Sequence, residues 1–192
     1  MSTAPHEEEQ IASERTPTTA TTTTEIVDPA PSILGTQQYW DDLYVKEVEN
    51  FEQFGDKGEV WFGEDVQDRV LMHIEQEFEG ILDPTSTKVL DLGCGNGMFL
   101  IQLSQEQSYE QLYGVDYSGP SIELAKKIAS SENIEINYEA VDFLDDGSFE
   151  ACELLQHAGG FQLIHDKGTF DAICLYADKE KRDVYKQRVL QL

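Results

Sequence analysis

The sequence of 192 residues is poor in basic residues and has no long apolar run. Its 13 lysines and arginines stand against 38 aspartates and glutamates, which gives a formal net charge of −25. This balance argues against direct binding to nucleic acid or to an anionic membrane surface, because both require basic patches. No apolar run approaches the roughly 18 residues of a membrane span. The charge fits either a basic partner or simple solubility.

Cysteine is also scarce. Cys94, Cys152 and Cys174 are far apart and odd in number, and the sequence contains no CxxC pair or Cys/His ligand spacing. We therefore expect neither a disulfide framework nor a metal site, and we expect a reducing, cytoplasmic location. The N-terminus lacks the basic and then apolar pattern of a signal peptide, and its early acidic residues argue against a transit peptide.

Residues 1–31 are of low complexity, with the run PTTATTTTE, several prolines and no aromatic residue. Such a segment cannot bury enough apolar surface to offset its ordering entropy, so we predict a disordered tail. Phosphorylation of the threonine run is the alternative to a plain tail. Composition changes at Ser32, and we divide the remainder into an N-terminal helical and aromatic region, residues 32–86, and a main domain, residues 87–192.

Aromatic residues are concentrated in residues 35–63. A helix is predicted over residues 39–48, with Trp40, Leu43 and Tyr44 on one side. Glycines punctuate residues 50–64, which predicts a loop. Its aromatic side chains either pack over a core edge or form a lid that closes over a ligand. A second helix is predicted over residues 64–78, because apolar residues recur there at every fourth position.

The clearest functional pattern is VLDLGCGNG, at residues 89–97. It predicts an apolar strand, a turn with three glycines and then a helix from residue 98, which together open a nucleotide-type site. Gly93, Gly95 and Gly97 lack a Cβ, so the backbone can turn sharply and lie close to a ligand. The N-terminus of the following helix offers unpaired N–H groups.

Candidate strands and helices alternate after this turn. Further strands are expected at residues 111–115, 134–141 and 161–165. Helices are expected from Ser118, at residues 149–157 and, as short pieces, at residues 171–176 and 183–190. This order predicts an α/β fold with a parallel sheet and right-handed crossovers.

An aspartate follows or ends each predicted strand: Asp91, Asp116, Asp142 and Asp166. Ligands of open parallel sheets bind beyond the carboxyl ends of the strands. Four acids there suit a ligand with hydroxyls, amino groups and positive charge, and they would repel a pyrophosphate. The G-x-G-x-G spacing also departs from the dinucleotide pattern. We therefore predict a phosphate-free adenosyl ligand such as S-adenosylmethionine, although any single aspartate is also a candidate helix cap or turn residue.

The strings VLDLGCGNG, GVDYS and VDFL, within residues 87–144, resemble the class I S-adenosylmethionine-dependent methyltransferases. The strings LGTQQYWDDLY, NFEQFGDKGEVWFGE and HDKGTFDAI extend the similarity to residues 32–190. They resemble the eukaryotic protein-lysine methyltransferases that modify translation elongation factor 1-alpha. This resemblance implies a Rossmann-like seven-strand methyltransferase fold, S-adenosylmethionine as cofactor and elongation factor 1-alpha as protein substrate.

The resemblance also implies site residues. It implies that Asp91 and the glycine turn hold the methionine part of S-adenosylmethionine, that Asp116 holds its ribose, and that Asp142 and Phe143 contact its adenine. Asp166 and residues 167–169 lie near the methyl group and the substrate channel. The expected cofactor-binding residues are Asp91, Gly93, Cys94, Gly95, Asn96, Gly97, Asp116, Tyr117, Asp142, Phe143 and Asp166.

Methyl transfer from a sulfonium needs little from side chains beyond orientation and proximity. The protein must still present an uncharged amine, although a free lysine has a pKa of about 10.4. Desolvation in an aromatic channel lowers that pKa. We expect Asp166 to orient the amine and Trp61 to form part of the channel wall. The alternatives are a helix cap for Asp166 and edge packing for Trp61. His165 is expected on the core side of the sheet or in solvent, and is not assigned as a base.

The resembled fold has three further strands after the last predicted helix, whereas this sequence ends at Leu192. We therefore expect four strands, with residues 161–165 as an exposed apolar edge. On this view the cofactor half is complete and the substrate half is not, so that the chain alone binds cofactor weakly and methylates poorly. A small-molecule methyltransferase and a non-catalytic cofactor-binding module remain the other functional classes.

Overall fold

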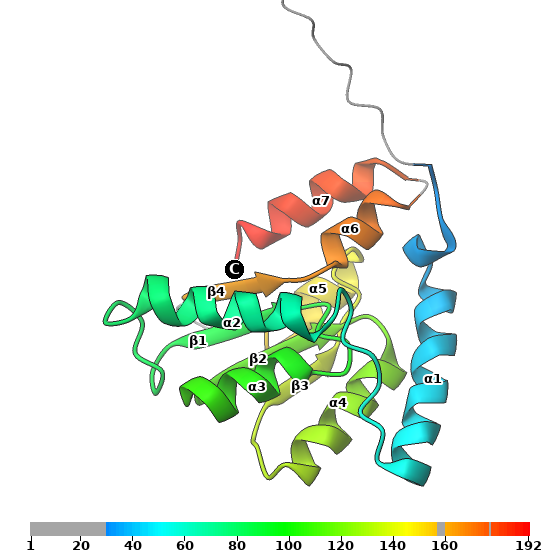
Figure 1. Ribbon diagram of the computed structural model, residues 1–192. Helices are drawn as coiled ribbons and strands as arrows, with labels where there is room; N and C mark the ends of the chain where they lie inside the picture. The colour runs from blue at the N-terminus through cyan, green and yellow to red at the C-terminus, as the bar shows by residue number, and fades with distance from the viewer. Residues whose placement is uncertain (1–29, 157–159, 177) are drawn as a thin grey trace, which may run out of the picture.

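A four-stranded sheet forms the centre of the computed structural model, which describes residues 30–156, 160–176 and 178–192 (Figure 1). All neighbouring strands pair in parallel, in the order β3-β2-β1-β4. Their bounds are β1 (Lys88–Leu92), β2 (Gln111–Asp116), β3 (Asn137–Ala140) and β4 (Leu163–Asp166). The predicted parallel α/β fold is therefore confirmed. Most of the predicted tail, together with residue 157 of one predicted helix, falls outside the described residues.

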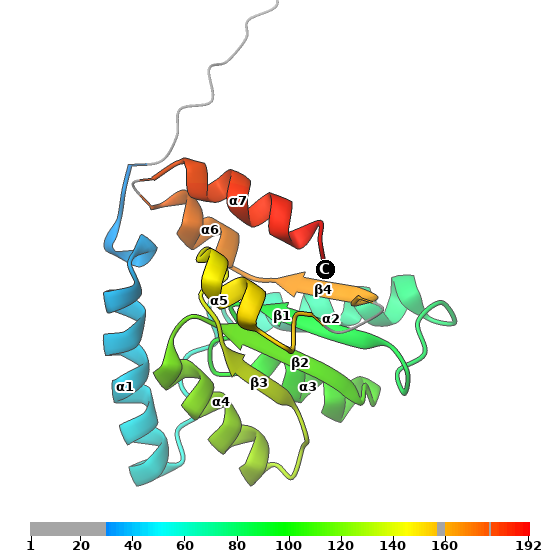
Figure 2. The same ribbon diagram turned by 180° about the vertical axis from the view of Figure 1, so that it is seen from behind.

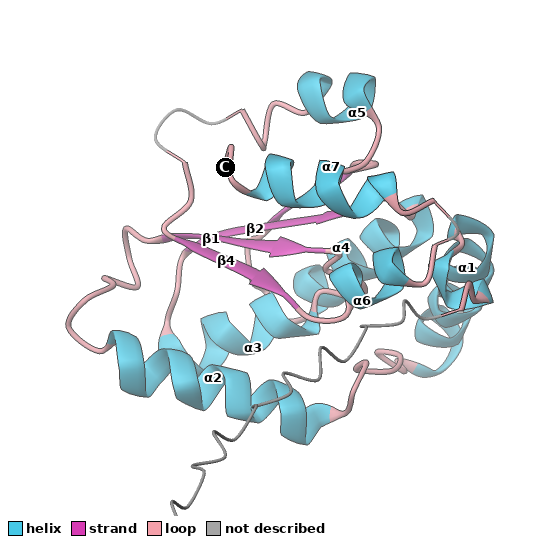
Figure 3. Ribbon diagram, turned by 90° about the horizontal axis from the view of Figure 1, so that it is seen from above, coloured by secondary structure: helices cyan, strands magenta, loops and turns pink. Residues whose placement is uncertain are grey.

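Helices cover both faces of the sheet (Figures 2 and 3). One face carries α2 (Glu64–Phe78), α3 (Met98–Gln107) and α4 (Gly119–Ser131), and the other carries α5 (Asp146–Ala151) and α7 (Glu180–Val189). A short 3₁₀ turn (Ile33–Gly35) and α1 (Gln37–Phe54) lead into the domain, and α6 (Thr169–Cys174) follows β4. None of the helices described here is both long and apolar enough to cross a membrane.

Alternation along the strands divides the core into two clusters, one on each face. In β1, Val89 faces α2, α3 and α4, whereas Leu90 and Leu92 face α5 and α7. All three side chains are almost completely buried. A strand that is buried on both faces carries apolar side chains on both, as expected in a parallel sheet. Each such side chain contributes about 1.5–3 kcal/mol to folding by its burial.

Element boundaries depart from the prediction at several elements, most of all at α1, β3 and α5. Helix α1 extends to Phe54, so the first residues of the predicted loop 50–64 are helical, and the helix ends where Gly55 adopts a left-handed φ of 72°. Strand β3 is shorter than predicted, because the N–H of Ile134 bonds to α4 rather than to the sheet. Helix α5 ends at Ala151, well before the predicted residue 157. The bounds predicted for α2 are confirmed.

Strand β4 lies at one end of the sheet, as predicted, but one face of it is covered. Ile164 packs into the same core cluster as Val189 and Leu192, and Tyr185 of α7 donates a hydrogen bond to Asp166 at the end of β4. The N–H of Phe161 also bonds to the carbonyl of Leu192. The edge position predicted for residues 161–165 is confirmed by the strand order. Their apolar side chains are partly buried rather than exposed, because the C-terminal helix folds back over one face of the strand (Figure 1).

Candidate functional site

A cavity of about 450 Å³ opens at the carboxyl ends of the strands. It brings together segments that are far apart in the sequence: the glycine turn, the ends of β2 and β4, the loop after β3, helix α1 and the loop before α2. Of the residues predicted to form the site, Gly97 and Asp166 are not part of its lining. Those that do line it are Trp61, Asp91, Gly93, Cys94, Gly95, Asn96, Asp116, Tyr117, Asp142 and Phe143.

The glycine turn is bound tightly to the neighbouring strand. Gly93 and Gly95 have φ angles of 69° and 54°, which side chains with a Cβ rarely adopt. The N–H groups of Gly93 and Cys94 both donate to the carbonyl of Val115 in β2, at 2.8 and 3.0 Å. A Cβ on Gly93 would lie 1.8 Å from the Oγ1 atom of Thr169. The turn therefore requires glycine for its conformation and for its close packing.

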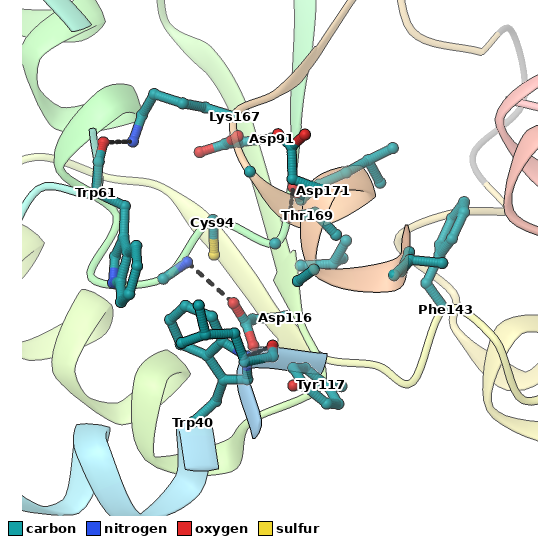
Figure 4. A pocket seen from close by; sticks show the side chains of 18 of the residues that line it. Trp40, Trp61, Asp91, Cys94, Asp116, Tyr117, Phe143, Lys167, Thr169 and Asp171 are labelled. Atoms are coloured by element: carbon teal, nitrogen blue, oxygen red, sulfur yellow. Dashed lines mark hydrogen bonds between the residues drawn. The ribbon is translucent and has the colours of Figure 1, made fainter. Parts of the chain in front are cut away.

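Asp116 anchors the turn from the end of β2. Its carboxylate accepts the N–H of Gly95 at 3.0 Å (Figure 4). It also accepts the N–H of Ser118 at 2.9 Å. Burial raises the pKa of Asp116 to about 6, and the two backbone N–H groups oppose this rise. A carboxylate has about four acceptor positions, so two backbone bonds leave capacity for hydroxyl groups of a ligand.

Asp91 pairs with a histidine on the neighbouring strand. The parallel register aligns Asp91 with His165, and the Nδ1 atom of the imidazole lies 2.7 Å from Oδ1 of the carboxylate. The imidazole also stacks on the ring of Phe99, with centroids 3.6 Å apart. His165 is thus on the core side of the sheet, which was one of its two predicted positions, and it lines the cavity as well. Sequence reasoning missed this role because strand register, which aligns the pair, is not visible in a local motif.

Asp166 is turned toward α6. Its carboxylate accepts the N–H of Thr169 at 3.0 Å and that of Phe170 at 3.1 Å, and it accepts the hydroxyl of Tyr185. Asp166 therefore makes the contacts expected of a helix cap, which was the alternative to its predicted role in orienting the amine. Only three of the four predicted rim acids, Asp91, Asp116 and Asp142, line the cavity.

Residues 55–63, which we call the aromatic loop, close one side of the cavity. The ring of Trp61 packs edge to face on Trp40 of α1, with centroids 4.7 Å apart. The side-chain amide of Asn96 donates to the carbonyls of Lys57 and Glu59, at 2.9 and 3.3 Å. The predicted lid residue Trp61 therefore both lines the cavity and packs on an aromatic neighbour.

Two further contacts hold the aromatic loop. The Nζ atom of Lys167 donates to the carbonyl of Trp61 at 2.8 Å (Figure 4). From α1, the carboxylate of Glu47 accepts the N–H of Glu59 at 3.2 Å. Burial raises the pKa of Glu47, and this backbone N–H lowers it. The direct partner of the Lys167 ammonium is thus a backbone carbonyl.

The loop after β3, which carries Asp142 and Phe143, is held by α7. Arg188 is buried, and its Nη1 atom donates to the carbonyl of Phe143 at 2.5 Å. Its Nη2 atom pairs with Asp146, and the guanidinium lies over the ring of Phe149 at 4.9 Å from the centroid. No sequence motif indicated this residue, because the partners lie 45 positions apart.

The chemistry of the lining fits a cationic, hydroxyl-bearing ligand without phosphates. Buried carboxylates stand at the ends of β1 and β2, and the glycine turn between them leaves room for a ligand against the backbone. Aromatic side chains supply much of the remaining wall. Across the described part of the chain, no group of three or more His, Cys, Asp or Glu residues is arranged to hold a metal ion.

Comparisons with known proteins agree with this chemistry. The family described as "Methyltransferase domain" matches residues 84–190. Protein-lysine N-methyltransferase efm4 of Schizosaccharomyces pombe is 40% identical over 173 residues, which cover 82% of this chain and 70% of that protein. The human EEF1A lysine methyltransferase 2 is 37% identical, over 81% of this chain and 61% of its own length. The chain thus spans less than two thirds of the human relative.

Solved structures support the same fold. A SAM-dependent methyltransferase from Anabaena variabilis aligns with a TM-score of 0.57 at 23% identity, over 85% of this chain and 58% of its own. Magnesium protoporphyrin IX methyltransferase from Synechocystis, with bound SAH, aligns with a TM-score of 0.54 at 15% identity, over 82% and 68% of the two chains. The chain belongs to the methyltransferase-domain family and, within it, to the family of the protein-lysine N-methyltransferase efm4.

Proposed function

We propose that this chain is an S-adenosylmethionine-dependent protein-lysine N-methyltransferase whose substrate is a lysine of translation elongation factor 1-alpha. The relatives of known name support the substrate, since two of them are named for EEF1A or for protein lysine. The observation that carries the proposal is a single cavity in which the glycine turn faces the aromatic pair Trp40 and Trp61. Such a cavity combines a cofactor cradle with apolar walls for a lysine side chain.

The cofactor is proposed to lie along the rim of the sheet. Asp142 and Phe143 after β3 are proposed to contact the adenine, Asp116 and Tyr117 after β2 the ribose, and Asp91 in β1 the amino group. When bound, the cofactor supplies a methyl group already activated on a sulfonium. The residues of the chain therefore need to bind, to orient and to exclude water, rather than to activate the donor.

The lysine amine must lose its proton before it can react. Trp61 and Trp40 are proposed to line its path, because an aromatic environment strips water from the ammonium and so lowers its pKa. Asp166 is proposed to orient the amine through Tyr185, whose hydroxyl donates to Asp166 and whose side chain lines the cavity. The phenol oxygen is then the atom of this chain that approaches the amine.

Three parts of the chain take distinct roles in this proposal. Residues 1–31 form a tail, residues 32–86 the lid region, and residues 87–192 the cofactor-binding domain. We place the protein in the cytoplasm, where elongation factors act. The acidic charge of −25 suits a basic protein partner and disfavours direct contact with nucleic acid or an anionic membrane surface.

Incubation of the purified chain with methyl-labelled S-adenosylmethionine and purified elongation factor 1-alpha tests the proposal. We expect label in the factor and a methylated lysine in its peptides by mass spectrometry. A Trp61→Ala variant should lose most of this transfer, whereas Met72→Ala, an exposed change on α2, should not. Label that enters a metabolite extract but not the factor would instead identify a small-molecule methyltransferase.

A further inference from the structure

Lys167 is an unusual residue for this cavity. The chain has 38 acidic residues against 13 basic ones, and five of those acids line the same cavity: Glu59, Asp91, Asp116, Asp142 and Asp171. Lys167 also lines it and is half-buried, yet within residues 30–156, 160–176 and 178–192 no carboxylate lies within ion-pair distance of its ammonium. Burial lowers the pKa of Lys167, and the charge of Asp91 raises it. A partly desolvated ammonium of this kind gains from an anionic partner.

The ammonium also has unused donor capacity. An ammonium carries three N–H donors. One of these donors bonds to the carbonyl of Trp61 at 2.8 Å. Among the described residues, this is the hydrogen bond that the Lys167 ammonium makes. Lys181, the other lysine that lines the cavity, instead lies over the ring of Tyr176, at 5.1 Å from its centroid. Lys167 is therefore the basic residue that stands near Asp91 with donors to spare.

The order of the strands places these charges in a row. Along β3-β2-β1-β4, the cavity presents Asp142, Asp116 and Asp91, and then the sign changes at Lys167, directly after β4. In Figure 4, Lys167 and Asp91 lie at one end of the site, and Asp116 with Tyr117 lies at the other. A ligand that spans the rim therefore meets adjacent negative and positive groups at the β1–β4 end.

An α-amino acid group matches this pair of charges, because its ammonium and carboxylate are attached to the same carbon. We propose that Lys167 binds the α-carboxylate of S-adenosylmethionine, beside the α-ammonium held by Asp91. The same ammonium keeps its bond to Trp61, so that one cation joins the cofactor to the aromatic loop. The identity of the ligand rests on the function proposed above, whereas the role of Lys167 rests on the placement of charges in the cavity.

A binding cycle with two ligands tests this role. Isothermal titration would compare S-adenosylmethionine with its decarboxylated analogue, which keeps the adenosyl, sulfonium and amine groups but has no carboxylate. We expect Lys167→Met to weaken binding of S-adenosylmethionine by about tenfold to a hundredfold, and to change that of the analogue by less than about threefold. Lys167→Arg, which keeps the charge, should recover most of the affinity. The matched control is Lys46→Met, an exposed lysine of α1, which should leave both affinities unchanged.

The two ligands separate this role from a purely structural one. If Lys167 only holds Trp61, the variant will weaken both ligands by the same factor, and the inference is wrong. It is equally wrong if neither affinity changes in a variant whose circular dichroism and melting temperature match the parent. A parent chain that binds neither ligand overturns the cofactor assignment and this inference with it. A parent chain that binds S-adenosylmethionine but labels no lysine overturns only the proposed substrate.

Discussion

Substitution of His165 by phenylalanine separates the two contacts that this residue makes inside the protein. Its Nδ1 atom lies 2.7 Å from Oδ1 of Asp91, and the two side chains are only 9% and 5% exposed. Its ring stacks on Phe99 at a centroid distance of 3.6 Å and an interplanar angle of 15°. Phenylalanine retains a flat ring but has no donor. Asparagine removes the ring but retains an N–H close to the position of Nδ1.

The two variants should therefore differ in stability. In His165→Phe the carboxylate of Asp91 stays buried without its partner, which costs about 3–5 kcal/mol of the free energy of unfolding. In His165→Asn the hydrogen bond is kept and the stacked apolar area is lost, which costs about 1–2 kcal/mol. Against a typical total of about 5–15 kcal/mol, the phenylalanine variant should show much the larger loss.

Urea unfolding at neutral pH, followed by tryptophan fluorescence and circular dichroism, measures both losses. Equal slopes of the free energy of unfolding against urea concentration would show that the parent and the variants have comparable unfolded states. The control is Phe99→Leu, which removes the stacking ring and leaves the Asp91–His165 pair in place. If His165→Asn proves less stable than His165→Phe, ring stacking outweighs the buried hydrogen bond and the reasoning about Asp91 is refuted.

Three further substitutions or conditions have defined outcomes. Burial raises the pKa of Asp116 from 3.8 to about 6; its contribution to stability should therefore fall as the pH rises from about 4 to about 6. The ionised carboxylate is the form that accepts ribose hydroxyls, so calorimetry should show weaker S-adenosylmethionine binding at about pH 5 than at about pH 7. Gly114→Ala would place a Cβ 2.6 Å from the ring of Tyr138 and should lower the free energy of unfolding by about 1–3 kcal/mol in urea. Arg188→Met leaves the carbonyl of Phe143 without its donor, and thermal unfolding should show a loss of about 1–3 kcal/mol.

The sheet was predictable because its information is local. Val89, Leu90 and Leu92 place apolar side chains on both faces of β1. A turn with three glycines of positive φ follows at once, and few structures other than such a strand-to-helix turn require this pattern. The end of α1 was less predictable. Phe51 packs against the core, so tertiary packing continues the helix through a segment that its composition marked as loop, until Gly55 ends it.

The site was predictable only in part, because side-chain direction depends on neighbours that are distant in sequence. Asp91 and Asp166 both sit at strand ends, and the motif alone does not distinguish them. In the structure, Asp91 faces His165 across the β1–β4 register, whereas Asp166 meets the first N–H groups of α6 and the hydroxyl of Tyr185. The N–H groups at the start of the short helix after β4 thus bind the carboxylate of Asp166, and Asp166 does not line the cavity.

The aromatic loop links the two halves of the proposed function. Its backbone is held by Glu47 of α1, by Asn96 of the glycine turn and by Lys167 after β4. The last two also line the cavity, so displacement of the loop breaks hydrogen bonds made by residues that a bound cofactor would contact. A ligand that orders Asn96 and Lys167 must then favour the closed loop, and by linkage a closed loop must favour the ligand. Since Trp61 is carried on this loop, the wall of the lysine channel is expected to be complete when the cofactor is in place.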